Sequence, residues 1–95
     1  MNRDEILDAA RDCVSVSRAA TYGDAAANFA NIAMLWQAYI DMLGGKGLTR
    51  HDVGPMLALF KIARHQANPS HVDSMVDACG YLALAGELST HVDMV

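Results

Sequence analysis

Hydrophobic residues recur at intervals of three and four through most of this chain, which is the pattern of helices that bury one side. Residues 3–18 and 25–43 show it in the first half, and residues 49–66 and 70–87 show it in the second. No stretch of any length alternates with the two-residue period of a half-buried strand. Since short connections favour antiparallel neighbours, the sequence predicts an all-α protein that folds as an antiparallel four-helix bundle.

Polar residues that can cap helices stand in front of these stretches. Asn2 is followed three residues later by Glu5, the spacing of a capping box, and Thr49 is followed by Asp52 in a variant of it. Asp24 is a favoured cap for the second helix. We expect Ser70 to cap the fourth.

Glycine and proline mark the breaks. A Gly-Gly pair at 44–45 ends the second helix and an Asn-Pro pair at 68–69 separates the third from the fourth. A Gly-Pro pair at 54–55 falls inside the third helix, where proline loses a hydrogen bond. It predicts either a kink or a helix that restarts at Pro55. Gly80 inside the fourth helix costs up to ~1 kcal/mol relative to alanine, which a close helix crossing would explain.

The composition adds an expectation about assembly. The chain has 95 residues, of which 53% are hydrophobic and 19% charged. This is one domain, 1–95, with 89–95 expected as a frayed tail, and it is too apolar for disorder. A domain of this size has too much surface to hide all its apolar groups. We therefore expect a homo-oligomer, and the alternative is a well-filled monomer.

Cysteines and aromatic residues are expected to lie inside the protein. Cys13 and Cys79 occupy apolar helical positions and form no C-x-x-C pair, so buried reduced thiols are expected rather than a disulfide. Phe29, Trp36 and Phe60 are most simply core residues.

Charge and motifs exclude several classes of function. The net charge is −4 and there is no basic run, so the electrostatic footprint for duplex nucleic acid is missing. The acidic, polar start is unlike a signal peptide, and no apolar run approaches the ~18 residues of a membrane span. We expect a cytoplasmic protein. The histidines and cysteines have no zinc spacing, and no P-loop or nucleophile elbow is present.

Opposite charges are concentrated on either side of the Asn-Pro pair at 68–69. Lys61 and Arg64 share one helix face, and Asp73, Asp77 and Tyr81 follow at i, i+4 and i+8. Folding the hairpin at the Asn-Pro pair brings the two groups together. In one interpretation these side chains are a structural latch of ion pairs. In the other, the carboxylates hold Mg²⁺ while the cations contact phosphate and the tyrosine contacts a base.

A second polar group surrounds the start of the second helix. Gly23 can turn the chain and Asp24 can cap the helix, which leaves Tyr22 to pack against its surroundings. In the alternative, Tyr22 covers a ligand, and Asn28 and Arg18 contact its polar edge.

These residues also fall into motifs shared with known proteins, covering about residues 18–84. The first half carries Arg18-x-x-Thr21-Tyr22-Gly23-Asp24, Asn28-Phe29, Ile32-Ala33 and Trp36. The second half carries Asp52-Val53, Leu59-Phe60-Lys61-Ile62-Ala63-Arg64, Asn68-Pro69, His71, Asp73, Asp77 and Gly80-Tyr81. Together they resemble a small phage and prophage protein family of unknown function. Members are sometimes fused to domains that look like nucleoside-processing enzymes, which implies a role in nucleotide metabolism.

A looser similarity is to the all-α nucleoside triphosphate pyrophosphohydrolases of the MazG type. It implies a helical, oligomeric, Mg²⁺-dependent protein. The signature of those enzymes is one E-x-x-E helix and one E-x-x-D helix. This chain has only two glutamates, Glu5 and Glu87, and its Asp73-x-x-x-Asp77 has another spacing. The resemblance therefore extends to nucleotide binding more readily than to hydrolysis.

Three hypotheses follow. The first is a phage-type protein that binds or processes a nucleotide; if it is an enzyme, water on Mg²⁺ attacks a phosphoanhydride. The second is a non-enzymatic phage protein that binds and inhibits a host defence or replication protein, and the third is an oligomeric module in which the charges only form a latch. In the first hypothesis the ligand-binding residues are Lys61, Arg64, Tyr81, Tyr22, Asn28 and Arg18, and the Mg²⁺ ligands are Asp73, Asp77 and Asp24.

Overall fold

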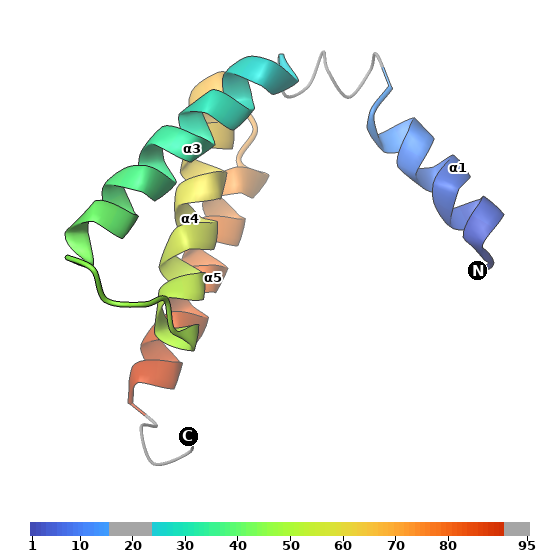
Figure 1. Ribbon diagram of the computed structural model, residues 1–95. Helices are drawn as coiled ribbons and strands as arrows, with labels where there is room; N and C mark the ends of the chain where they lie inside the picture. Colours follow the sequence, from blue (N-terminus) through green and yellow to red (C-terminus); the bar gives the residue numbers. More distant parts are fainter. Residues whose placement is uncertain (16–23, 91–95) are drawn as a thin grey trace.

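The computed structural model describes residues 1–15 and 24–90, and Figure 1 shows their arrangement. Four helices and no strand occur in these ranges. This confirms the all-α prediction. The first helix ends at Cys13 and not at the expected residue 18, and residues 91–95 of the expected frayed tail lie outside the described residues. The helices are α1 (Arg3–Cys13), α3 (Ala25–Met42), α4 (Arg50–Ala67) and α5 (Asp73–Ser89).

Three of the four expected caps are present. The side chain of Asn2 accepts a hydrogen bond from the Glu5 amide at 2.9 Å, and α1 begins with a complete capping box. Asp24 accepts from the Ala27 amide at 3.0 Å at the start of α3. Thr49 and Asp52 form the capping box of α4.

The Ser70 cap is wrong. Helix α5 begins three residues later than expected, at Asp73, and has no side-chain cap. The hydroxyl of Ser70 instead donates to the side chain of Asn68 at 3.0 Å. Ser70 therefore stabilises the turn before α5, because a short polar side chain competes for hydrogen bonds within turns as readily as it caps a helix.

Helices α4 and α5 form the tightest pair of the fold (Figure 1). Helix α4 runs unbroken through Pro55, so the expected restart at that residue is wrong. Close packing against α5 explains the glycine at position 54. A Cβ on Gly54 would stand 2.7 Å from Ala85 Cβ and 2.9 Å from the Tyr81 carbonyl oxygen. The close crossing expected at Gly80 thus occurs at Gly54, and a Cβ on Gly80 would meet no atom within 4 Å.

Helix α3 packs on α4 from the other side, so α4 is the central helix of this group. Side-chain hydrogen bonds connect α3 to α4. The indole N–H of Trp36 donates to the Met56 carbonyl at 2.7 Å, and the Tyr39 hydroxyl donates to Asp52 Oδ1 at 2.7 Å.

Helix α1 stands apart from the other helices in Figure 1, and none of its residues is buried. The four-helix bundle is therefore not confirmed. Among the described helices, close packing is found between α3 and α4 and between α4 and α5.

The core of this single chain is thin. No side chain among the described residues is fully buried, and the buried apolar residues are only Ile32, Ala58, Ala63 and Ala78. Several expected core residues are exposed because their helix faces lack a covering element: Phe29 is 70% exposed, and Cys13 and Cys79 are exposed free thiols. The accessible surface is 6925 Å², whereas a compact monomer of this mass has about 5,300 Å².

Candidate functional site

The α4–α5 hairpin brings together opposite charges, as the sequence predicts. Lys61 Nζ lies 2.8 Å from Asp77 Oδ2. Gly54, Ala58 and Lys61 follow one another at i, i+4 and i+7, so the tight crossing at the glycine also directs the lysine toward α5. The lysine side chain is 12% exposed and the aspartate side chain 48%. The two side chains form an ion pair between α4 and α5 whose carboxylate remains open to solvent.

Lys61 and Arg64 of α4 lie against one aromatic ring. Lys61 Nζ is 5.4 Å and the Arg64 guanidinium carbon is 4.8 Å from the centroid of Phe60. A cation over an aromatic face is attracted by the negative face of the ring. The ring therefore helps to hold two positive groups side by side on α4.

Asp73 lies one helical turn before Asp77, in the first turn of α5, where the helix dipole favours a negative charge. Its side chain is 77% exposed, and its Oδ2 is 4.0 Å from His71 Nε2. This contact is an ion pair only when the imidazole is protonated. Tyr81 is half-buried one turn after Asp77, and its carbonyl lies at the close crossing with Gly54.

Two of the remaining predicted ligands, Asp24 and Asn28, fall within the described residues. Asp24 and Asn28 lie at the start of α3, where Asp24 caps the helix and its carbonyl accepts from the Asn28 amide at 3.0 Å. Tyr22 and Arg18 lie outside the described residues. Within residues 1–15 and 24–90, no three His, Cys, Asp or Glu side chains group closely enough to hold a metal ion.

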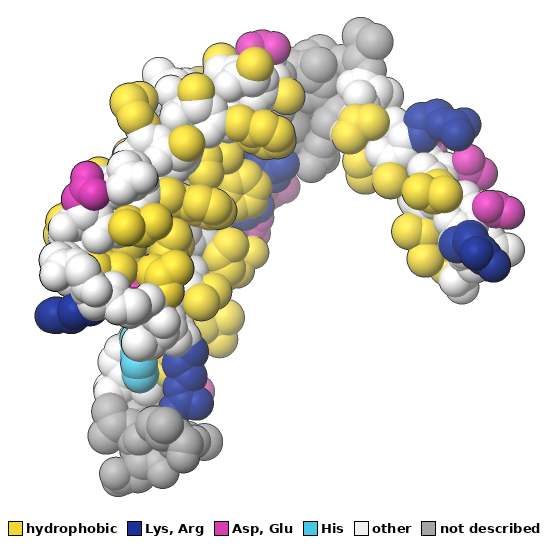
Figure 2. All heavy atoms as spheres, viewed as in Figure 1, with side chains coloured by type: hydrophobic (Ala, Val, Ile, Leu, Met, Phe, Trp, Pro, Cys, Tyr) yellow, Lys and Arg dark blue, Asp and Glu magenta, His cyan; other side chains and the backbone are white. Residues whose placement is uncertain are grey.

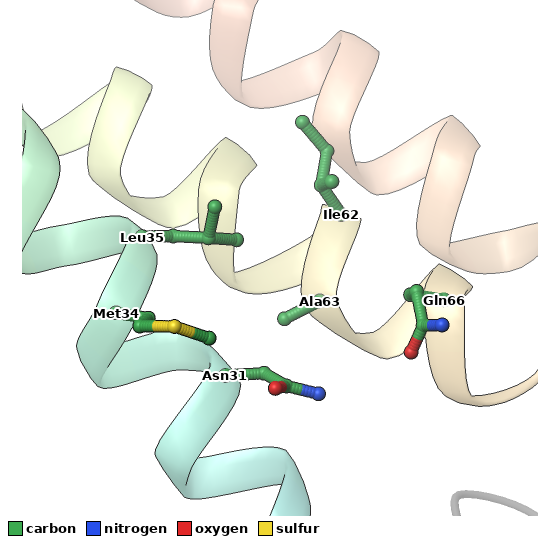
Figure 3. Close-up of a pocket in the computed structure, with 6 residues that line it drawn as sticks. All are labelled: Asn31, Met34, Leu35, Ile62, Ala63 and Gln66. Atoms are coloured by element: carbon green, nitrogen blue, oxygen red, sulfur yellow. The ribbon is translucent and has the colours of Figure 1, made fainter.

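The structure contains a groove that the sequence analysis did not predict. Figure 3 shows the residues that line it, which come from α3 and α4. The groove has a volume of about 460 Å³ and mainly apolar walls. The sequence signal that could have indicated a groove was the presence of further apolar residues in these helices, such as Met34 and Ile62. The lining residues are Asn31, Met34, Leu35, Ile62, Ala63 and Gln66.

The Tyr39–Asp52 hydrogen bond changes the acidity of both groups. It lowers the pKa of the Asp52 carboxyl below its ordinary 3.8, aided by the hydrogen bond from the Thr49 amide. The same bond, with some desolvation, raises the pKa of the Tyr39 hydroxyl above 10.0. Both effects fit a structural contact between α3 and α4.

No helix in the described part of the chain is both long and apolar enough to cross a membrane.

Comparison with known proteins identifies relatives in phages. The chain is 39% identical over 88 residues to the Gene 55 protein of Mycobacterium phage L5, covering 93% of this chain and 54% of that protein. It is 33% identical over 78 residues to the Gene 55 protein of Mycobacterium phage D29, covering 82% and 49%. The chain thus spans about half the length of the curated relatives it matches, and no solved structure matches it.

These relatives support the resemblance to phage proteins of unknown function, whereas the similarity to MazG-type enzymes is not shown. Residues 5–89 match a protein family described as a domain of unknown function, DUF6378. Because the match covers most of the sequence, the chain belongs to the DUF6378 family.

Proposed function

We propose that the α4–α5 hairpin binds the phosphate groups of a nucleotide. The observation that carries the proposal is the Lys61–Asp77 pair, which places a nearly buried lysine against a half-exposed carboxylate. A lysine so placed can exchange its contact with a carboxylate oxygen for one with a phosphate oxygen, and both accept charge-assisted hydrogen bonds. Arg64 lies on the same aromatic ring and adds a second cation.

The carboxylates of α5 fit Mg²⁺ that arrives with the phosphates. Mg²⁺ is usually held by one or two carboxylates together with phosphate oxygens and waters, and not by an all-protein cage. Asp73 and Asp77 stand one helical turn apart with exposed oxygens, which suits this mode. When bound, the ion would neutralise charge on the phosphate oxygens. The third predicted ligand, Asp24, is engaged as the cap of α3.

Contacts to the base or sugar remain assigned to Tyr81, which shares the helix column of the two aspartates. The contributions predicted for Tyr22, Asn28 and Arg18 belong to the same proposal. Nucleotide hydrolysis would need more than binding, and no catalytic residue is assigned.

Thermal unfolding of the full chain tests this function. A panel of nucleoside mono-, di- and triphosphates is added with and without Mg²⁺, and we expect at least one to raise Tm, because a ligand of the folded state stabilises it. Lys61→Met should abolish the shift, whereas Lys46→Met, an exposed lysine in the α3–α4 connection, should not. If none of the nucleotides raises Tm, the proposal is rejected.

A second candidate is protein binding without chemistry, such as binding and inhibition of a host defence or replication protein. The exposed apolar surface supports it: Figure 2 shows hydrophobic side chains spread over the visible face of the helices. Val72, the residue before α5, and Val76, one turn later, are 66% and 62% exposed. A tagged chain should retain a host protein from lysate, and Val76→Glu should release it. Equal retention by both chains would argue against this face.

A further inference from the structure

The groove between α3 and α4 has the character of a helix-binding site. It joins an apolar floor to two uncharged amide side chains, Asn31 and Gln66, and none of the described residues that line it is charged. Two of its apolar members are open to solvent: Met34 is 66% exposed and Ile62 is 44% exposed. Amphipathic helices bind such grooves through apolar residues spaced at i, i+3, i+4 and i+7.

Helix α1 is an unpartnered helix with that spacing. Ile6, Ala9, Ala10 and Cys13 follow at i, i+3, i+4 and i+7, with Leu7 and Val14 beside them. Ile6 is 52%, Leu7 62% and Val14 81% exposed. The opposite side carries charges, including an exposed Asp8–Arg11 pair at 3.7 Å. An isolated helix of 11 residues is marginal in water even when it is well capped, so α1 needs a surface on which to pack.

The exposed area points to a second copy as the partner. The accessible surface of 6925 Å² exceeds that of a compact monomer of this mass by roughly 1,600 Å². A stable interface buries about 800 Å² on each partner. The excess is therefore large enough for each copy to contribute a helix and receive one. A two-fold axis makes the two contacts identical, which closes the assembly at two subunits.

We propose that α1 of one copy packs in the α3–α4 groove of a second copy, and that the exchange is reciprocal. This inference does not depend on nucleotide binding, because none of the residues proposed to bind the nucleotide is among those that line the groove. It assigns a role to the two features that the fold of one chain leaves without a partner.

The molar mass of the full chain in solution tests the dimer. Light scattering after gel filtration should give twice the mass of one chain. Ile6→Glu and Met34→Glu should each raise the dimer dissociation constant on the order of tenfold or more, since each places a charge in an apolar contact. Arg11→Glu, on the charged side of α1, is the matched control and should remain dimeric. A monomer at all concentrations, or dimers unaffected by both substitutions, would overturn the proposal.

Crosslinking separates exchange between copies from packing within one chain. In a background with Cys13→Ser and Cys79→Ser, one tagged copy carries Ile6→Cys and a differently tagged copy carries Met34→Cys. After unfolding and refolding together, oxidation should give a disulfide that joins the two tags. A chain that carries both cysteines and forms only the intramolecular disulfide would show that α1 packs on its own chain. Circular dichroism confirms that each variant keeps its helices.

Discussion

The bond between Tyr39 and Asp52 is a single contact with a defined pH dependence. It needs a protonated tyrosine and an ionised aspartate. Because the pKa of Asp52 is lowered in the folded state, its contribution is present above about pH 3.8 and is lost as the pH falls through the lower folded value. Because the pKa of Tyr39 is raised, its contribution is present below pH 10.0 and is lost as the pH rises through the raised value.

We therefore expect the contribution of this bond to be nearly constant between these limits, and Tm to fall below about pH 4 as that contribution is lost. Tyr39→Phe should lower Tm at pH 7 and make the acid-side decline less steep, because it removes the main cause of the lowered aspartate pKa. Asp52→Ala should have a larger effect, because it also removes the acceptor of the hydrogen bond that the Thr49 backbone N–H donates. Thermal melts from pH 3 to 7 provide the measurement. A Tyr39→Phe profile that coincides with that of the unmodified protein would show that the bond does not form.

At the scale of elements, the two glycines of the α4–α5 hairpin have opposite roles. Gly54→Ala should destabilise the protein by about 1–3 kcal/mol, because the new methyl group overlaps Ala85 and the Tyr81 carbonyl. Gly80→Ala should stabilise it by up to about 1 kcal/mol, because the position is open and alanine favours the helix. Urea unfolding compares the two. The same sign for both variants would contradict the crossing described for Gly54.

The ion pair of this hairpin should respond asymmetrically to its two single substitutions. Asp77→Asn leaves a nearly buried lysine without its charge partner, whereas Lys61→Met leaves a carboxylate that water already reaches. We expect Asp77→Asn to lower the free energy of unfolding by about 1–3 kcal/mol and Lys61→Met to lower it less. Solvent screening at the half-exposed aspartate should keep the coupling energy near 1 kcal/mol. A double-mutant cycle measures that coupling energy. A coupling energy of zero would show that the ion pair does not stabilise the hairpin.

The elements of the fold follow from local rules, and the contacts between them do not. The caps at Asn2, Asp24 and Thr49 were readable because a cap and its partner lie within three residues. The convergence of Lys61 with Asp77 was readable because a short turn joins their helices. The role of Gly54 was not, because it depends on which face of α4 meets Tyr81 and Ala85. Likewise, the α3–α4 groove arises from relative placement of two helices.

At the scale of the whole molecule, the apolar composition and the thin core belong together. A chain that is 53% hydrophobic leaves large side chains exposed on every described helix. The radius of gyration is 16.0 Å, against about 12 Å for a compact domain of this length. Such a shape buries too little to balance the entropy of folding by itself, so association should supply part of the stability.

We therefore expect Tm to rise with protein concentration. Subunits that unfold as they separate obey mass action, so a hundredfold increase in concentration shifts the equilibrium by about 2.7 kcal/mol per dimer. For a domain of this size the corresponding rise in Tm is of the order of several degrees. Melts from micromolar to near-millimolar chain concentration provide the measurement, and Ile6→Glu should remove most of the dependence. If Tm of the unmodified chain stays constant over that range, the three helices α3, α4 and α5 are stable without a partner, and the exposed apolar faces serve binding and not folding.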